Sequence, residues 1–268
     1  MQLADLQVAV RPRNAWEAMD LGIRLAQNEA ILLWKTWFCV TLPVFLLVLA
    51  LVLATGNTWY SLLLWWLKPL YDYALLIVLS RRVFGETPTL GNTLRALAGS
   101  WRQGLLNHLL IRRLSMSRSY LLPVWLLEQL PARERAPRIA IMRKLYTGRA
   151  RWLFIVMLHF ELILGLTALS LVFWLAPSGQ TGMLWELFTE ENSNQLVHAA
   201  QVLAYFFAMS VVEPFYVAAG FSLYLNRRTE LEAWDLELAF RHLRERLESP
   251  GPNLQEKTVA GKTPEHSA

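Results

Sequence analysis

The sequence predicts an all-α, polytopic membrane protein with four transmembrane helices, arranged as two repeated hairpins, and with amphipathic cytosolic helices. Three observations lead to this fold class. The 268 residues are 54% hydrophobic and 18% charged, a composition typical of integral membrane proteins. Four apolar stretches are long enough to span a bilayer, which takes about 20 helical residues. Two of the connections between these stretches contain no lysine or arginine.

The chain divides into six segments by composition. We expect the four spans at residues 32–54, 59–79, 152–176 and 196–225. The last segment has turn-forming residues and few apolar ones, which is typical of disorder. In order, the segments are a cytosolic interfacial helix (1–30), a first transmembrane hairpin (31–80), a cytosolic helical segment (81–150), a second transmembrane hairpin (151–225), a cytosolic amphipathic helix (226–248) and a disordered tail (249–268).

The distribution of basic residues predicts the orientation. Apart from Lys68, every lysine and arginine lies before or at the start of the first span, between the second and third spans, or after the fourth. By the positive-inside rule, both termini and residues 83–150 are cytosolic, and the 177–195 loop faces outward. The net charge of +5 lies beside the spans, where it would attract anionic lipid heads. We therefore expect a lipid bilayer as partner and no nucleic acid.

The first segment contains an amphipathic helix over residues 14–28. Asn14 can cap it, and Glu17 three residues later completes a capping-box-like start. Such a helix could lie on the inner membrane surface or pack on the protein's own cytosolic segment. The first span then contains Pro43, and a short turn at 55–58 leads into the second span.

The middle segment has apolar residues at helical spacing over 93–113. A second apolar stretch, 113–130, is interrupted at Pro123. It is too short for a span, and it either dips into the interface or packs under the helices. A fifth span here would also place basic segments outside. Pro137 is expected to open a basic helix that leads to Arg151 and the third span.

The second and fourth spans contain a related pattern. One reads LKPLYDYALLIVLSRR and the other VEPFYVAAGFSLYLNRR. Lys68-Pro69 aligns with Glu213-Pro214, and both stretches end in paired arginines at the membrane face. This similarity predicts two copies of one in–out–in hairpin, related by an axis along the membrane normal. The two arginine pairs are Arg81-Arg82 and Arg227-Arg228.

The repeat predicts an intramembrane charged centre. Lys68 lies roughly 20 Å from Arg81 along its helix, and Glu213 roughly 21 Å from Arg227, so they share a depth. A charge at the bilayer centre costs about 2.5–3.5 kcal/mol, which favours pairing the two. Asp72, one turn from Lys68, can compete for it, and Glu161 of the third span is expected near the depth of Asp72. Pro69 and Pro214 are expected to kink the two helices.

The sequence has no catalytic signature, and we expect no cofactor. His159 and Glu161 have no second pair of ligands nearby, so no metal site is predicted, and no Gly-rich phosphate loop occurs. The charged centre has three interpretations. It is a structural ion-pair lock, a proton, ion or small-molecule pathway, or a recognition site for a lipid or partner helix.

Two stretches resemble known families. The stretch EPFYVAAGFSLYLNRRTELEAWDLELAF resembles the end of glycerophosphoryl-diester-phosphodiesterase membrane-domain-like proteins of bacteria. That resemblance includes no catalytic domain and implies no hydrolysis. The stretch RLSMSRSYLLPVWLLEQL resembles uncharacterised proteobacterial inner-membrane proteins. These accompany a MoxR-type AAA+ ATPase and a transglutaminase-like membrane protein.

These resemblances imply a location and a role. The location is the bacterial inner (cytoplasmic) membrane, and the partners are other membrane proteins. We therefore expect a non-enzymatic assembly or scaffold component of a multi-protein system. One alternative is a small transporter or channel that uses the charged centre, and another is a lipid-binding membrane domain. A cavity that reaches Lys68 would favour transport, and a dry, closed pair would favour the scaffold.

Overall fold

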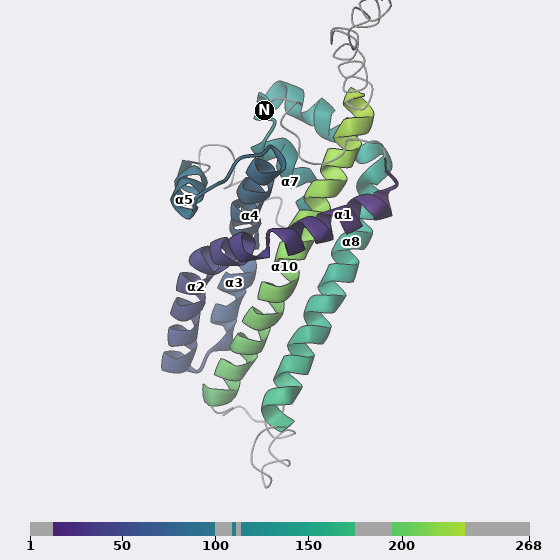
Figure 1. The fold of residues 1–268 in the computed structure, drawn as a ribbon. Helices are drawn as coiled ribbons and strands as arrows, with labels where there is room; N and C mark the ends of the chain where they lie inside the picture. The colour runs from purple at the N-terminus through teal and green to yellow at the C-terminus, as the bar shows by residue number, and fades with distance from the viewer. Residues whose placement is uncertain (1–12, 100–108, 111–113, 175–194, 234–268) are drawn as a thin grey trace, which may run out of the picture.

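The described part of the chain folds into helices joined by turns (Figure 1). The computed structural model describes residues 13–99, 109–110, 114–174 and 195–233, and no strand occurs among them. The elements are α1 (Ala15–Asn28), α2 (Ala30–Thr55), the 3₁₀ turn η2 (Thr58–Tyr60), α3 (Ser61–Trp66), α4 (Lys68–Val83), α5 (Leu90–Gly99), α7 (Arg118–Leu126), α8 (Ala132–Trp174) and α10 (Gln195–Glu232).

Four helical stretches have the length and composition needed to cross a membrane. The second combines η2, α3 and α4, and the others belong to α2, α8 and α10. An all-α chain with four candidate spans is therefore confirmed. The stretches are Ala30–Thr55, Thr58–Val83, Arg133–Leu171 and Val197–Glu232.

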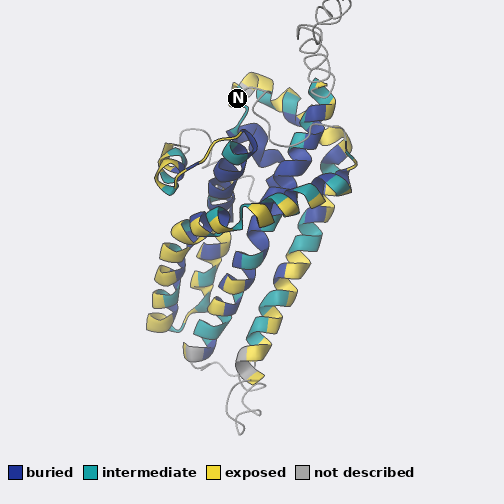
Figure 2. Ribbon diagram, in the orientation of Figure 1, coloured by how far each residue is buried: buried dark blue, intermediate teal, exposed yellow. Residues whose placement is uncertain are grey.

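Burial separates two inner helices from two outer ones (Figure 2). The most apolar windows of α2 and α8 are only 22% and 11% buried, against 67% for η2–α4 and 72% for α10. The exposed positions on α2 and α8 include many leucines and phenylalanines. Such broad apolar surfaces are the ones that hydrocarbon chains can cover. The outer helices therefore carry surfaces suited to contact with lipid, and α4 and α10 form the interior.

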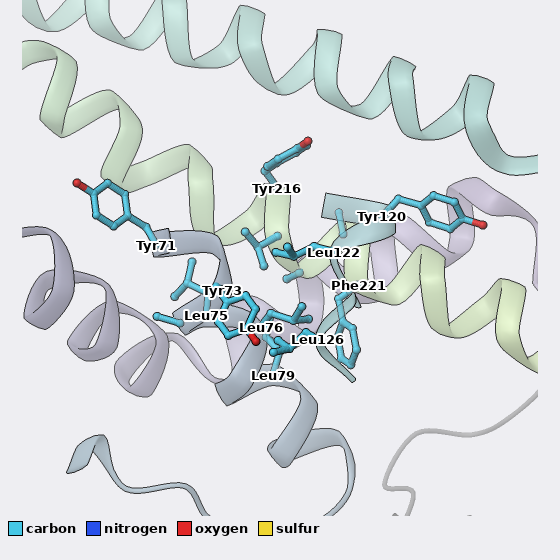
Figure 3. Close-up of a cluster of buried hydrophobic side chains, with 14 of the residues drawn as sticks. Tyr71, Tyr73, Leu75, Leu76, Leu79, Tyr120, Leu122, Leu126, Tyr216 and Phe221 are labelled. Carbon is cyan, nitrogen blue, oxygen red and sulfur yellow. The ribbon is translucent and has the colours of Figure 1, made fainter. Parts of the chain in front are cut away.

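The core lies where α4, α7 and α10 meet (Figure 3). Leu76 and Leu79 of α4, Leu122 of α7 and Phe221 of α10 belong to one buried cluster, and each is at most 1% exposed. Trp37 of α2 joins it and meets the Tyr71 ring edge-on, with 5.6 Å between ring centroids. The cluster fixes α4 and α10 side by side, which brings the start of α4 next to the middle of α10.

The second span is broken just before its proline. α3 ends at Trp66, Leu67 lies between the helices, and α4 begins at Lys68. Pro69 lies in the first turn of α4, where its missing N–H would have had no helical partner. Pro69 thus starts a new helix rather than bending a continuous one. Pro214, by contrast, lies inside α10, which continues to Glu232.

Helix α1 packs across α10. As predicted, Asn14 caps it, accepting a 2.8 Å hydrogen bond from the Glu17 backbone N–H. Gly22 allows the close approach, because a Cβ there would lie 2.4 Å from the Ala218 carbonyl oxygen. Packing on the protein itself is one of the two placements that the sequence left open, and the element that α1 mainly contacts is α10. Its placement on the inner membrane surface stays a prediction.

Helix α7 is a short internal element. All nine of its residues, including Pro123, are buried. Nine residues are too few to span a bilayer, in agreement with the rejection of a fifth span. The apolar stretch that contains α7 therefore packs beneath the neighbouring helices, one of the two arrangements left open by the sequence.

Two predicted boundaries are absent because the helices run through them. α8 extends from Ala132 to Trp174, so the basic helix and the third span form one element. That helix begins before Pro137 rather than at it. α10 likewise continues past the predicted boundary at residue 225, because the following residues are ordinary helix formers without glycine or proline. The predicted 177–195 loop, most of the 226–248 helix and the tail lie outside the described residues.

Candidate functional site

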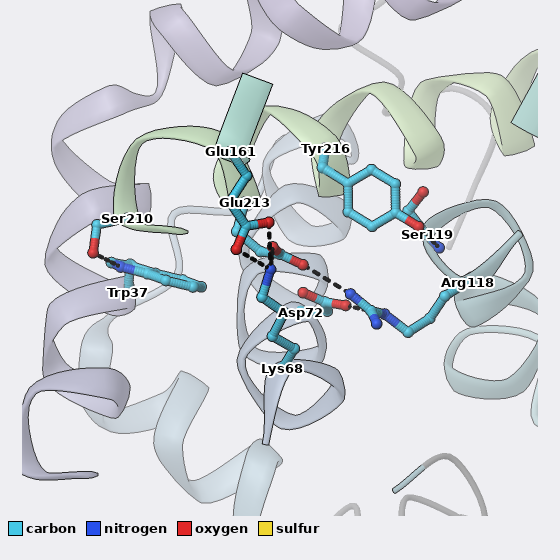
Figure 4. A network of polar contacts seen from close by, with 9 residues as sticks. All are labelled: Trp37, Lys68, Asp72, Arg118, Ser119, Glu161, Ser210, Glu213 and Tyr216. Carbon is cyan, nitrogen blue, oxygen red and sulfur yellow. Dashed lines mark hydrogen bonds and ion pairs between the residues drawn. The ribbon is translucent and has the colours of Figure 1, made fainter. Parts of the chain in front are cut away.

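Lys68 begins α4 and belongs to a buried ion-pair network (Figure 4). Its Nζ atom lies 2.7 and 2.6 Å from the two carboxylate oxygens of Glu161 and 2.9 Å from Oε2 of Glu213. The residue is 6% exposed. These oxygens match the three donors of an ammonium group. The Lys68–Glu213 contact is the pairing expected from the repeat.

Arg118 is the second cation of the network, and the sequence analysis did not find it. It begins α7, and its Nε donates to Oδ2 of Asp72 at 2.6 Å. Its Nη2 donates to Oε1 of Glu213 at 2.8 Å. Asp72 was expected to compete for Lys68. The structure pairs it with Arg118, and Glu161 takes the place beside Lys68.

The charged centre is defined here as these five residues. They come from four elements: two from α4, and one each from α7, α8 and α10. None is more than 9% exposed. The structure therefore brings together all four predicted residues and adds one. The five are Lys68, Asp72, Arg118, Glu161 and Glu213.

A signal for Arg118 was present in the sequence. The spans contain three carboxylates that now lie in the centre, and away from the span ends Lys68 is the only lysine or arginine. Buried charges need partners, so this imbalance calls for another cation from outside the spans. Arg118 stands directly before an apolar run, in contrast to exposed Arg95 of α5.

Surrounding contacts hold Arg118 in position. Its guanidinium lies 5.6 Å from the centroid of the Tyr216 ring, and the Ser119 backbone N–H donates to the Tyr216 hydroxyl at 3.4 Å. Gly220 allows α7 to approach α10, because a Cβ there would lie 2.2 Å from Ser119 Oγ. The guanidinium group of arginine is not deprotonated in proteins, and here it pairs with Asp72 and Glu213. Arg118 is therefore a permanent cation.

The centre lies inside the apolar length of the bundle. Trp152 and Trp174, which are 51% and 81% exposed, lie on either side of Glu161 along α8. At the helical rise, Glu161 is roughly 14 Å from Trp152 and roughly 20 Å from Trp174. A hydrocarbon layer about 30 Å thick would therefore contain the charged centre near its middle.

A cavity of about 540 Å³ lies beside the centre, and Lys68, Arg118, Glu161 and Glu213 form part of its wall. The rest is mostly apolar. The other lining residues include Trp65 of α3, Leu114 and Met116 before α7, Phe154, Leu158 and Leu162 of α8, and Ala204, Tyr205 and Val212 of α10.

The cavity opens along one side of α8. Leu158, Leu162 and Leu166 recur every fourth residue, line the cavity and are still 47%, 59% and 55% exposed. Residues at this spacing share one helix face. In a bilayer this face would meet hydrocarbon, and the cavity would then be accessible from the lipid side.

The predicted arginine pairs bond to glutamates. Arg82 Nε lies 2.7 Å from Glu29 Oε2, which joins the end of α4 to the start of α2. Arg81 lies 3.8 Å from Glu86. Arg227 and Arg228 pair with Glu230 and Glu232 on the same helix, each at 3.0 Å. These arginines therefore form ion pairs near helix ends, and their position at a membrane face stays a prediction.

No protein-family model, curated protein or solved structure matches this chain. Within the described residues, no three His, Cys, Asp or Glu side chains are arranged to hold a metal ion. The function is therefore argued from the charged centre and the cavity.

Proposed function

We propose that this chain is a non-enzymatic, multi-pass membrane protein that binds an amphipathic molecule between its helices. One observation supports this proposal above the others. A largely apolar cavity has four residues of the charged centre in its wall, and it opens along the lipid-facing side of α8. Its volume of about 540 Å³ is in the range of small-molecule sites.

The two kinds of wall suit the two parts of such a ligand. Leu162, Leu166 and Val212 offer apolar surface to a hydrocarbon portion, and its polar head meets the charged centre. Access from the side avoids moving the apolar portion through water. The ligand class is therefore lipids and lipid-like molecules that already reside in the bilayer.

The cavity favours ligand binding over a purely structural lock. A lock requires a dry, closed pair, whereas Lys68, Glu161 and Glu213 all border open volume. Transport stays the second candidate, supported by the Lys68–Glu213 contact at matched positions of the proposed repeated hairpins. In this second candidate, the bound molecule passes the centre when one hairpin moves against the other.

The proposal also includes the membrane location and the orientation predicted from the sequence. Both termini and the segment containing α5 and α7 lie in the cytosol of a bacterium, and the four spans cross its inner membrane. The association with a multi-protein membrane system that the resemblance implies belongs to this proposal. Within such a system, the chain would serve as its ligand-binding membrane component.

Native mass spectrometry of the chain purified in mild detergent tests the function. We expect a bound amphipathic molecule on the wild type and its loss in Ala204→Trp, because Ala204 lines the cavity and is 5% exposed. Leu203→Trp is the matched control on the same helix, since Leu203 is 51% exposed and absent from the cavity wall. A wild type without ligand, or equal retention by both variants, would contradict the proposal.

A further inference from the structure

The charged centre has more negative groups than positive ones. Asp72, Glu161 and Glu213 are three carboxylates, and Lys68 and Arg118 are two cations. The tyrosines near them are Tyr71 on α4, and Tyr205 and Tyr216 on α10. A phenol does not supply a positive charge. With every carboxyl ionised, the centre would hold one uncompensated negative charge in an apolar layer.

The geometry also indicates where that charge is offset when the cavity is empty. Asp72 and Glu213 accept hydrogen bonds from neighbouring nitrogens of one guanidinium group, Nε and Nη2 of Arg118, so their carboxyl groups lie side by side. Asp72 is fully buried, and its Oδ1 atom accepts no hydrogen bond from a donor. Two carboxylates that share one site repel each other, which favours a proton on one of them. The Asp72–Glu213 pair is therefore a place for one proton.

The cavity offers a second way to offset the charge. Glu161 is the carboxylate on the cavity wall contributed by α8, and Lys68 binds both of its oxygens. Aromatic residues from three helices line the same volume: Trp65, Phe154, Tyr205 and Tyr216. A cation near an aromatic face is attracted by the ring's negative face. A ligand with a positive charge and an apolar body fits both features.

From these observations we infer that the cavity selects hydrophobic cations, and that binding one releases a proton from the Asp72–Glu213 pair. This inference rests on the proposed function and names its ligand class. The positive charge of the bound cation then balances the third carboxylate in place of the proton. The released proton passes to water. No bond other than this O–H bond breaks.

The same charge count disfavours an anionic ligand. A phosphate or sulfate head beside Lys68 would compete with three carboxylate contacts that already surround the ammonium. It would also add negative charge to a centre that already has a surplus. Uncompensated charge in a low-dielectric interior is costly. If Lys68 and Arg118 alone determined recognition, an anionic ligand would bind more tightly than a cationic one.

Two ions of nearly equal size and opposite charge test the inference. The full chain is first exchanged in an uncharged maltoside detergent to remove bound lipid. Calorimetry then measures the binding of tetraphenylphosphonium and of tetraphenylborate in buffers with different ionisation enthalpies, which reports the protons exchanged. We expect saturable binding of the phosphonium with release of about one proton near neutral pH, and weaker binding of the borate.

Three results in the wild type would overturn the inference: no phosphonium binding, equal or tighter borate binding, or phosphonium binding without proton release. None of these would overturn the proposed function, because an amphipathic molecule retained in native mass spectrometry and lost in Ala204→Trp would still show ligand binding. These measurements need no substitution in the charged centre.

A variant tests the role of the surplus charge. Glu161→Gln keeps the side-chain shape and leaves two carboxylates for two cations. We expect roughly tenfold or greater loss of phosphonium affinity and little proton release, because the cation would now be uncompensated. Glu134→Gln is the matched control on the same helix, since Glu134 is exposed. Unchanged binding and proton release in folded Glu161→Gln would also overturn the inference.

Discussion

Glu213 joins the two cations of the charged centre, because its two carboxylate oxygens have different partners. Oε2 lies 2.9 Å from Lys68 Nζ, and Oε1 lies 2.8 Å from Arg118 Nη2. Glu161 forms its ion pair with Lys68, and Asp72 forms its ion pair with Arg118. The five residues therefore form a chain of pairs, Glu161–Lys68–Glu213–Arg118–Asp72, in which the outer members depend on one neighbour each.

This order predicts how double substitutions behave. Lys68→Met alone leaves Glu161 without its cation and should lower stability by about 3–5 kcal/mol. Adding Glu161→Gln should recover much of that loss, because the remaining three residues keep their pairs. Adding Glu213→Gln instead should recover less, because Glu161 stays stranded and Arg118 loses a partner. Thermal unfolding in detergent measures all three variants, and the reverse order of recovery would contradict the chain of pairs.

Part of the charged centre could be predicted from the sequence. The aligned Lys68 and Glu213 were found because a repeat gives two positions at one depth. The pairing of Glu161 was missed because depth estimates along ideal helices are too coarse to separate Lys68 from Asp72, one turn apart. Arg118 was missed because it lies outside the spans, and its insertion depends on tertiary packing of α7.

At the scale of elements, two glycines set the closest approaches. Gly22 lets α1 cross α10 at Ala218, and Gly220 lets α7 reach α10 at Ser119. The second crossing positions part of the charged centre, since α7 begins with Arg118. Glycine at such places is required by space rather than by backbone conformation.

The crossing of α1 can be tested with matched glycine substitutions. Gly22→Ala should lower stability by about 1–3 kcal/mol, because the new methyl group overlaps the Ala218 backbone. Gly148→Ala is the control within α8, where nothing lies within 4 Å of the added Cβ. There, alanine should be neutral or stabilise by about 0.5–1 kcal/mol through its higher helix propensity. Equal thermal midpoints for both variants would show that α1 does not depend on this contact.

The helix ends differ in how far the neighbouring sequence determines them. The cap of α1 was predicted because Asn14 and Glu17 act through neighbouring backbone. The break at Leu67 and the continuity of α8 through Pro137 were not predicted. Proline permits either a helix start or an interior position, and packing decides between them. Helix identity was therefore easier to predict than helix ends.

At the scale of the whole molecule, the exposed α2 and α8 flank the more buried α4 and α10 (Figure 2), and the charged centre is buried among these helices. This arrangement inverts that of a water-soluble protein, whose charges lie outside. It was predictable in outline, because span length and basic-residue placement follow from the bilayer. The cavity was not, since it depends on how side chains from several helices leave space.

The predicted orientation can be tested with single cysteines in a Cys39→Ser background. Asn57→Cys, between α2 and η2, should react with a membrane-impermeant maleimide added to intact cells. Asn92→Cys, on α5, should react only after the membrane is permeabilised. Both positions are exposed, so differences in labelling report the side of the membrane. Labelling of Asn92→Cys in intact cells would reverse the proposed topology.

The position of Arg118 between the two pairs of candidate spans has a consequence for biogenesis. Chain synthesis proceeds from Lys68 to Arg118 before it reaches Glu161 and Glu213. Both cations of the centre are therefore made before the two carboxylates of the last two spans. Those spans emerge with acidic groups and no basic partner within their apolar length. The earlier half of the chain can thus receive the later half, so the ribosome's order of delivery shortens the time that either carboxylate spends alone in lipid.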